Sequence, residues 1–334
     1  MPRSKLRSKQ IILYTLGDPA GIGPEIIVKV LSKKKFLSSA VHVIIADEDV
    51  LKKTKTYLNS TLKFNAIIEF NSNNFKKGSL NIINIKNAGN TKPGVSSKTA
   101  GKASLEYLEK AVEVLKKYPQ AIQALITLPV SKRQIELTGI KFKGHTEYLK
   151  EKFKAPSVLM IFLTDRFDVL LYTRHIPLKD VAKSIKKEGL VSAVSEAVDF
   201  YRKKCRFQPK VAMLGLNPHA GEGGTIGREE KDIIIPVVKR LKDKSINIDG
   251  PHPADGFFRN LEDTKYNLIV SMYHDQVLPL IKSAFPGTVN FSLGLPFLRF
   301  SPDHGTAFDI AGLGIAKTDS LEKAIEYALK FKCR

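Results

Sequence analysis

The chain has 334 residues, of which 43% are hydrophobic and 26% charged. These values are typical of a globular protein and exclude a disordered chain. The formal net charge of +21 raises the question of a polyanionic partner. However, the lysines form short runs scattered over predicted helix ends and loops, and no aromatic side chains interleave with them. This pattern favours a solvated basic surface over a nucleic-acid-binding face, and such a surface also steers anionic substrates.

No stretch reaches the roughly 18 apolar residues needed to span a bilayer, so we expect a soluble protein without membrane contacts. Two cysteines, Cys205 and Cys333, are too few for a disulfide framework and lack metal-ligand spacing. They favour a reducing, cytoplasmic location. The basic segment Met1–Gln10 precedes an apolar run that is too short for a signal peptide, and we assign it no role.

In the first half of the chain, apolar runs alternate with helical repeats. Strands are expected at Ile11–Leu16, Val41–Asp47, within 59–90 and at Ala121–Thr127, and an amphipathic helix at Lys98–Lys117. The turn Gly17–Gly23 leads into a helix opened by Pro24 and Glu25. It suits a phosphate or a cofactor, and equally a simple connection, but it has neither the dinucleotide glycine fingerprint nor a Walker lysine.

The second half continues the same alternation. Strands are expected at 157–163 and 167–173, joined as a hairpin, and at 211–216 and 267–270; helices are expected at 189–204, 228–241 and 320–330. Segment 250–256 is expected to be a polar loop. The order predicts an α/β fold with a parallel-rich sheet.

Three histidines follow apolar runs, at the places where open α/β sheets carry their chemistry: His175, His219 and His274. Three imidazoles with an open position form the pattern of a catalytic divalent-metal site. They are far apart in sequence, so isolated core or capping histidines remain the alternative. Asp275 could orient an imidazole or act as a base.

Other polar residues lie in loops or beside apolar sequence. Asp255 and Asp303 are candidate acids or bases, or ordinary turn residues. Lys282 and Arg299 suit an anion better than the surface lysines do. In Gly144-His145-Thr146-Glu147, Thr146 is either a helix cap or, with His145, part of an anion site.

Taken together, the loops resemble those of the 4-hydroxythreonine-4-phosphate dehydrogenase family of pyridoxal-phosphate biosynthesis. The resemblance rests on Gly17-Asp18-Pro19-Ala20-Gly21-Ile22-Gly23-Pro24-Glu25, Gly144-His145-Thr146-Glu147, Asn217-Pro218-His219-Ala220-Gly221-Glu222, Tyr273-His274-Asp275-Gln276 and Asp303-His304-Gly305-Thr306-Ala307. These motifs run in order over nearly the whole chain.

The resemblance implies NAD-dependent oxidation of the substrate 3-hydroxyl, followed by decarboxylation to 3-amino-2-oxopropyl phosphate. NADP in place of NAD, and Zn, Mg or Co as the metal, stay open. It implies a homodimer with shared active sites, in which the metal ligands are His175, His219 and His274. Substrate contacts would come from His145, Thr146, Lys282, Asn290 and Arg299, and acid/base chemistry from Asp255 and Asp275.

The implied fold resembles that of isocitrate and isopropylmalate dehydrogenases, with two α/β/α domains and a cleft between them. The first domain would comprise 1–130 and 290–334, and the second 131–289. Three alternatives remain: a dehydrogenase of the same family acting on 4-phospho-D-erythronate or threonate, a metal hydrolase, and a basic nucleic-acid-binding protein.

Overall fold

The computed structural model describes residues 10–259 and 265–331, which form two compact units. Unit 1 comprises the described residues up to Val158 together with Gly294–Phe331, and unit 2 comprises Leu159–Leu293. Residues 131–158 are part of unit 1 in this division, and residues 290–293 are part of unit 2. Residues 1–9 of the basic N-terminal segment and Cys333 lie outside the described residues.

Unit 1 is built on a parallel sheet. Its strands follow the order β3 (Phe64–Ile67), β4 (Leu80–Asn84), β2 (Val41–Ala46), β1 (Ile11–Thr15), β5 (Ile122–Thr127) and β12 (Leu298–Pro302). Every neighbouring pair is parallel. Strands β1 and β2 are buried along their whole length, which explains their unbroken apolar sequence. The three predicted strands that become β1, β2 and β5 are confirmed within a residue or two, and β3 and β4 lie in the region where short strands were expected; β12 was not foreseen.

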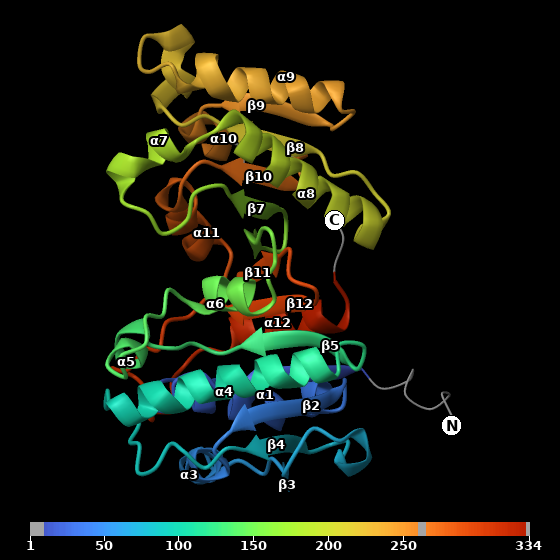
Figure 1. The fold of residues 1–334 in the computed structure, drawn as a ribbon, viewed down its shortest axis with the longest axis vertical. Helices are drawn as coiled ribbons and strands as arrows, with labels where there is room; N and C mark the ends of the chain where they lie inside the picture. The colour runs from blue at the N-terminus through green and yellow to red at the C-terminus, as the bar shows by residue number, and fades with distance from the viewer. Residues whose placement is uncertain (1–9, 260–264, 332–334) are drawn as a thin grey trace. The chain divides into compact units, whose positions relative to one another are not determined.

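Helices cover this sheet. They are α1 (Gly23–Ser32), α2 (Lys34–Leu37), α3 (Glu48–Tyr57), α4 (Lys98–Lys117), α5 (Lys132–Glu136), α6 (His145–Lys152) and α12 (Asp319–Leu329). Helix α4 occupies the predicted residues, and the Ser97 side chain caps it by accepting from the Ala100 N–H. It packs on β1 and β2 and lies in front of them in Figure 1. Helix α1 packs against both α3 and α12.

The sheet of unit 2 is mixed. Its order is β11 (Val289–Leu293), β6 (Leu159–Leu163), β7 (Asp168–Leu171), β10 (Leu268–Ser271), β8 (Val211–Leu214) and β9 (Ile248–His252). The predicted hairpin is confirmed, since β6 runs antiparallel to β7. Strands β7, β10, β8 and β9 are parallel. Strand β9 was wrongly expected to be a loop; Gly250 and Pro251 fit there because the strand lies at the edge of the sheet.

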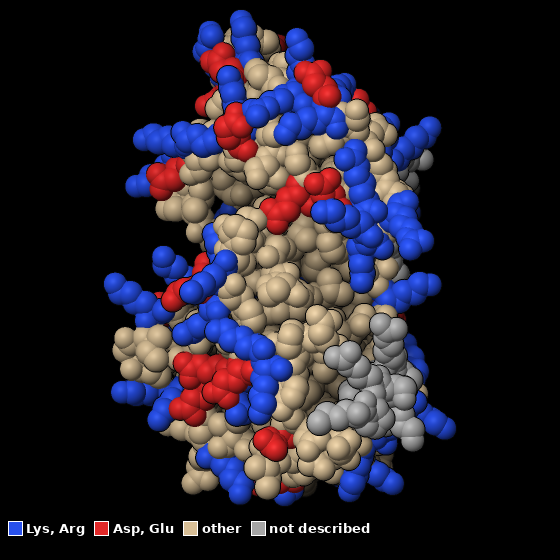
Figure 2. Space-filling view, turned by 45° about the vertical axis from the view of Figure 1, so that its right-hand side comes forward, with Lys and Arg blue, Asp and Glu red and all other residues tan. Residues whose placement is uncertain are grey.

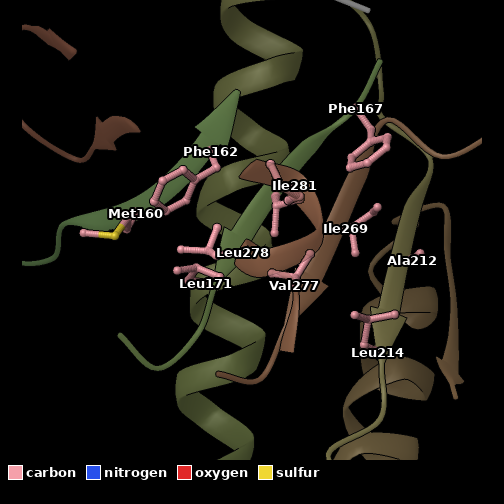
Figure 3. Packing of buried hydrophobic residues seen from close by; sticks show 11 residues of the cluster. Met160, Phe162, Phe167, Leu171, Ala212, Leu214, Ile269, Val277, Leu278 and Ile281 are labelled. Atoms are coloured by element: carbon pink, nitrogen blue, oxygen red, sulfur yellow. The ribbon is translucent and has the colours of Figure 1, made fainter. Parts of the chain in front are cut away.

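Unit 2 carries α7 (Val181–Ser184), α8 (Lys187–Cys205), α9 (Ile235–Asp243), α10 (Ala254–Arg259) and α11 (Leu278–Ala284). Helix α11 packs against the strands through Val277, Leu278 and Ile281 (Figure 3). The predicted helix 228–241 is interrupted, because Glu230–Ile234 forms a π-helical turn before α9 begins.

No helix in the described ranges is long and apolar enough to cross a bilayer.

Candidate active site

A buried cation is the centre of the polar cluster in unit 1. Arg299 lies on β12 beside β5 and is only 2% exposed. Its Nε donates to Thr127 Oγ1 at 3.1 Å, and its Nη1 to Thr146 Oγ1 at 3.4 Å. Burial lowers the pKa of Arg299 to about 10, so the guanidinium remains charged at neutral pH. A buried cation surrounded by hydroxyl groups suits an anionic ligand.

His145 lies at the start of α6, next to this cation. Burial, followed by the charges of Arg299 and Lys132, holds the pKa of His145 well below its usual value. The imidazole is therefore neutral near pH 7. Its Nε2 is buried without a hydrogen-bond partner among the described residues, which leaves one ring nitrogen for a ligand.

The sequence left two roles open for Thr146, and the structure excludes one of them, the helix cap. Helix α6 begins at His145 behind Gly144, and no side chain caps it. Thr146 lies within the first turn, buried, with its hydroxyl on Arg299. Gly144 has φ +133°. An added Cβ there would lie 3.3 Å from both Glu147 Oε2 and Lys132 Cε, so only glycine fits this bend.

Sequence reasoning missed two members of this cluster. Thr127, the last residue of β5, orients Arg299 through its hydroxyl. Lys132 approaches Gly144 and influences His145 electrostatically. Thr127 ends β5 and Lys132 begins α5 five residues later, and nothing in the sequence connected this segment with Arg299 on β12.

Unit 1 also offers a place for a cofactor. The loops after β1 and β5 meet where the strand order reverses, which is where open α/β sheets bind ligands. Asp18 N–H donates to Pro129 O at 2.8 Å, and Ile22 N–H donates to Thr306 O at 3.0 Å. The Asp18 carboxyl is buried, which raises its pKa to about 6. The glycine-rich turn thus lies between the β5 loop and the segment around Thr306.

In unit 2, two of the three singled-out histidines are neighbours. The ring centroids of His175 and His274 are 5.5 Å apart. The loops that carry them run together, since Thr173 Oγ1 donates to Met272 O at 2.6 Å. His274 Nδ1 pairs with Asp275 Oδ1 at 2.8 Å. This contact fixes the tautomer and leaves Nε2 of His274 for a ligand.

The histidine pair fits half of a metal site. Two imidazoles that bind one ion at a Zn–N distance of about 2.0–2.1 Å place their ring centres about 5 Å apart. Within the described residues of one chain, no group of three His, Cys, Asp or Glu side chains is close enough to hold an ion. His219, exposed in the turn Pro218–Gly224 after β8, is therefore not grouped with the other two.

The remaining candidates are also in unit 2. Asp255 is exposed on α10, and Lys282 is exposed on α11. Asn290, on β11, has a buried Oδ1 without a hydrogen-bond partner among the described residues. Asp303, in unit 1, follows β12, and its N–H donates to Ser320 Oγ at 3.0 Å, as expected of a turn residue. None of these contacts assigns a catalytic role.

Comparison with known proteins places this arrangement in a family. A relative from Sulfurihydrogenibium sp., named 4-hydroxythreonine-4-phosphate dehydrogenase, is 42% identical over 96% of this chain and 98% of its own length. A relative from Halalkalibacterium halodurans, provisionally named D-threonate 4-phosphate dehydrogenase, is 37% identical over 98% of both chains.

Solved structures agree. The 4-hydroxythreonine-4-phosphate dehydrogenase of Klebsiella pneumoniae superposes with a TM-score of 0.84 at 32% identity, covering 98% of this chain and 99% of that one. The sequence model of the pyridoxal phosphate biosynthetic protein PdxA matches residues 38–328. The chain therefore belongs to the PdxA family.

Proposed function

We propose that this chain oxidises the 3-hydroxyl of 4-phosphohydroxy-L-threonine with NAD and a divalent metal, and that the product decarboxylates to 3-amino-2-oxopropyl phosphate. The observation that carries the proposal is the buried Arg299 cation beside a neutral His145 whose Nε2 lacks a partner. This combination suits an anionic, hydrogen-bonding substrate, and the relatives named 4-hydroxythreonine-4-phosphate dehydrogenase act on one.

Each unit has its own part in the proposal. In unit 1, Arg299, Thr146 and His145 are the proposed contacts of the anionic substrate, and in unit 2 Lys282 and Asn290 are further candidates for substrate binding. His274, held by Asp275, and His175 would hold the metal, with His219 as the third ligand. A bound dication lowers the pKa of a hydroxyl and stabilises an enolate. Asp275 and Asp255 are the candidates for accepting and returning protons.

The cofactor is proposed to bind at the turn Gly17–Gly23 and the segment around Thr306 in unit 1. Its chemistry is to accept the hydride. The turn lacks a Rossmann fingerprint, so the sequence does not decide between NAD and NADP. A cytoplasmic location is part of the proposal, since soluble pyridine nucleotides are its co-substrates.

A homodimer completes the proposal. The described residues of one chain bring His175 and His274 together without a third ligand. In a symmetric dimer each chain can supply its His219 to the His175 and His274 of the other chain, which gives two equivalent sites.

A second substrate has support from one observation. The relative from Halalkalibacterium halodurans carries a D-threonate 4-phosphate name at 37% identity, close to the 42% of the first relative. Phosphothreonate and phosphohydroxythreonine share the phosphate and the vicinal oxygen pattern. A nucleic-acid-binding function has less support, because Lys and Arg are spread over the face in Figure 2 among acidic and neutral residues.

The test of substrate identity is a competition. Purified protein with NAD and metal is given 4-phosphohydroxy-L-threonine or 4-phospho-D-threonate, and the two kcat/KM values are compared by NADH absorbance. We expect the amino acid to be preferred. Preference for the threonate would leave the proposed site unchanged but would assign the enzyme to sugar-acid catabolism. If neither substrate is turned over, the dehydrogenase proposal is contradicted.

A further inference from the structure

The turn that carries His219 has an unusual backbone. Residues 219–223 all have positive φ angles, between 42° and 78°. Three of them are not glycine: His219, Ala220 and Glu222. For such residues the left-handed conformation costs roughly 1–2 kcal/mol each. A run of this kind persists only where its surroundings impose it.

One buried carboxylate provides that constraint. Glu230 is 2% exposed. Its Oε1 accepts from the N–H groups of Leu216 and Asn217, each at 2.7 Å, and its Oε2 accepts from Asn217 Nδ2 at 2.9 Å. Three hydrogen bonds to one carboxyl group fix the chain immediately before His219, where the left-handed run begins.

The local sequence makes room for this carboxylate. The π-helical turn Glu230–Ile234 places Glu230 at the start of an irregular turn, a feature that frequently marks functional sites. A Cβ on Gly221 would lie 2.5 Å from Glu230 Oε2, and one on Gly215 would lie 3.1 Å from Oε1. The glycines of this loop are therefore required for the close approach of the carboxylate.

A second side chain links this loop to the one that carries His274. Gln276 Nε2 donates to Gly215 O at 2.6 Å, while its Oε1 accepts from Met272 N–H at 2.8 Å and Ser271 Oγ at 2.9 Å. The loops after β8 and β10 thus share one hydrogen-bond network, with Glu230 on one side and Gln276 on the other.

From this geometry we propose that Glu230 is a positioning residue that presets His219 for metal binding by holding its turn in the left-handed conformation. The inference rests on the proposed function, which makes His219 a ligand. Glu230 acts through the backbone and touches neither metal nor substrate. Without Glu230 the His219 imidazole would still be present, but its turn would adopt several backbone conformations, of which only one binds the metal. Metal affinity would therefore fall.

The test uses Co²⁺ as the probe, titrated into the purified full-length protein and followed by its visible absorption. We expect Glu230→Gln to weaken Co²⁺ binding about 10- to 100-fold, in the range seen when groups that orient metal ligands are lost. Glu230→Asp, which keeps the charge but has a shorter reach, should give a smaller loss. The control is Glu229→Gln. Among the contacts described, Glu229 accepts only from Asn217 Nδ2, at 2.8 Å, and has no contact with the backbone of the turn. The Co²⁺ affinity of this variant should match that of wild type.

A double-mutant cycle distinguishes positioning from general destabilisation. In a His219→Ala background, Glu230→Gln should weaken Co²⁺ binding no further, because the residue through which it acts is gone. The inference would be overturned if Glu230→Gln weakened Co²⁺ binding equally in the His219→Ala background and in wild type, or if it had no effect in wild type. Either result would leave His219 a ligand. Unchanged Co²⁺ affinity in His219→Ala alone would overturn the metal assignment of the proposed function as well.

Discussion

Arg299 illustrates how burial turns a common side chain into a binding group. Its guanidinium is held by two threonine hydroxyls on different elements, β5 and α6. The residues adjacent in sequence identified Arg299 and Thr146 as candidates, but they did not predict the hydrogen bond between the two side chains. Contacts between residues 153 positions apart are set by the sheet, not by local spacing.

Replacing Arg299 with lysine tests the value of its planar geometry. The charge remains, but the fork that reaches Thr127 and Thr146 is lost. We expect a loss of about 1.5–3 kcal/mol of substrate binding, or roughly 10- to 150-fold in kcat/KM, measured by NADH formation. Arg133→Lys, on the exposed side of α5, is the control. Equal rates for the Arg299 variant and wild type would contradict the role of Arg299.

Asp18 gives a prediction about pH. Burial raises the pKa of its folded-state carboxyl to about 6, above the usual 3.8. The folded protein therefore holds this proton more tightly than the unfolded chain, and stability is lost as pH rises from about 4 to 6. Asp18→Asn should remove this loss, which amounts to up to about 3 kcal/mol.

The measurement is urea unfolding of Asp18→Asn and wild type at pH 4, 6 and 8. The variant should gain stability relative to wild type at pH 8 and little at pH 4. The exposed Asp243→Asn serves as the control and should follow wild type. A constant difference between Asp18→Asn and wild type at all three pH values would contradict the raised pKa.

At the scale of elements, periodicity and caps predicted what the chain determines locally. Helix α4 was predicted to the residue, since its apolar repeat and Ser97 cap are both local signals. Strand β9 was missed, because an edge strand tolerates glycine and proline that normally indicate a loop. The π turn at Glu230 was also missed, since its cause is a hydrogen-bond network and not a repeat.

The packing of α4 against α5 supplies a prediction at this scale. A Cβ on Gly101 would lie 2.2 Å from the Gln134 carbonyl oxygen, so no side chain fits between the two helices. Alanine normally favours a helix by about 1 kcal/mol over glycine. Here we expect Gly101→Ala to destabilise by about 1–3 kcal/mol through overpacking, and to raise KM because α5 carries Lys132.

Thermal unfolding and steady-state kinetics of Gly101→Ala test this. Gly256→Ala on α10 is the matched control, because no atom lies within 4 Å of its added Cβ. The control should be as stable as wild type or slightly more so. A Gly101 variant that is as stable as this control would show that the two helices separate at little cost.

At the scale of the whole molecule, family membership and the α/β character of both units were predictable from sequence motifs and element order. The contact between His175 and His274 was not, because the pairing of two loops brings these residues together. His219 lies in a strained turn of the same unit. In the proposed homodimer a second chain completes the three-histidine set, and mixing of subunits tests this proposal.

In that test, His175→Ala and His219→Ala proteins, each expected to be inactive, are unfolded together and refolded as a mixture. A dimer with one chain of each kind retains one intact site if His219 binds in its partner's site. Random pairing would then restore roughly a quarter of wild-type activity. Refolding each variant alone is the control. No recovery would contradict shared sites.

The most direct measurement for the whole account is NADH absorbance with 4-phosphohydroxy-L-threonine and NAD, recorded with chelator and then with added Zn²⁺, Mg²⁺ or Co²⁺. We predict reduction that is abolished by the chelator and restored by at least one of the ions. Reduction that is insensitive to chelator, or absent with every ion, would contradict a metal-dependent dehydrogenase.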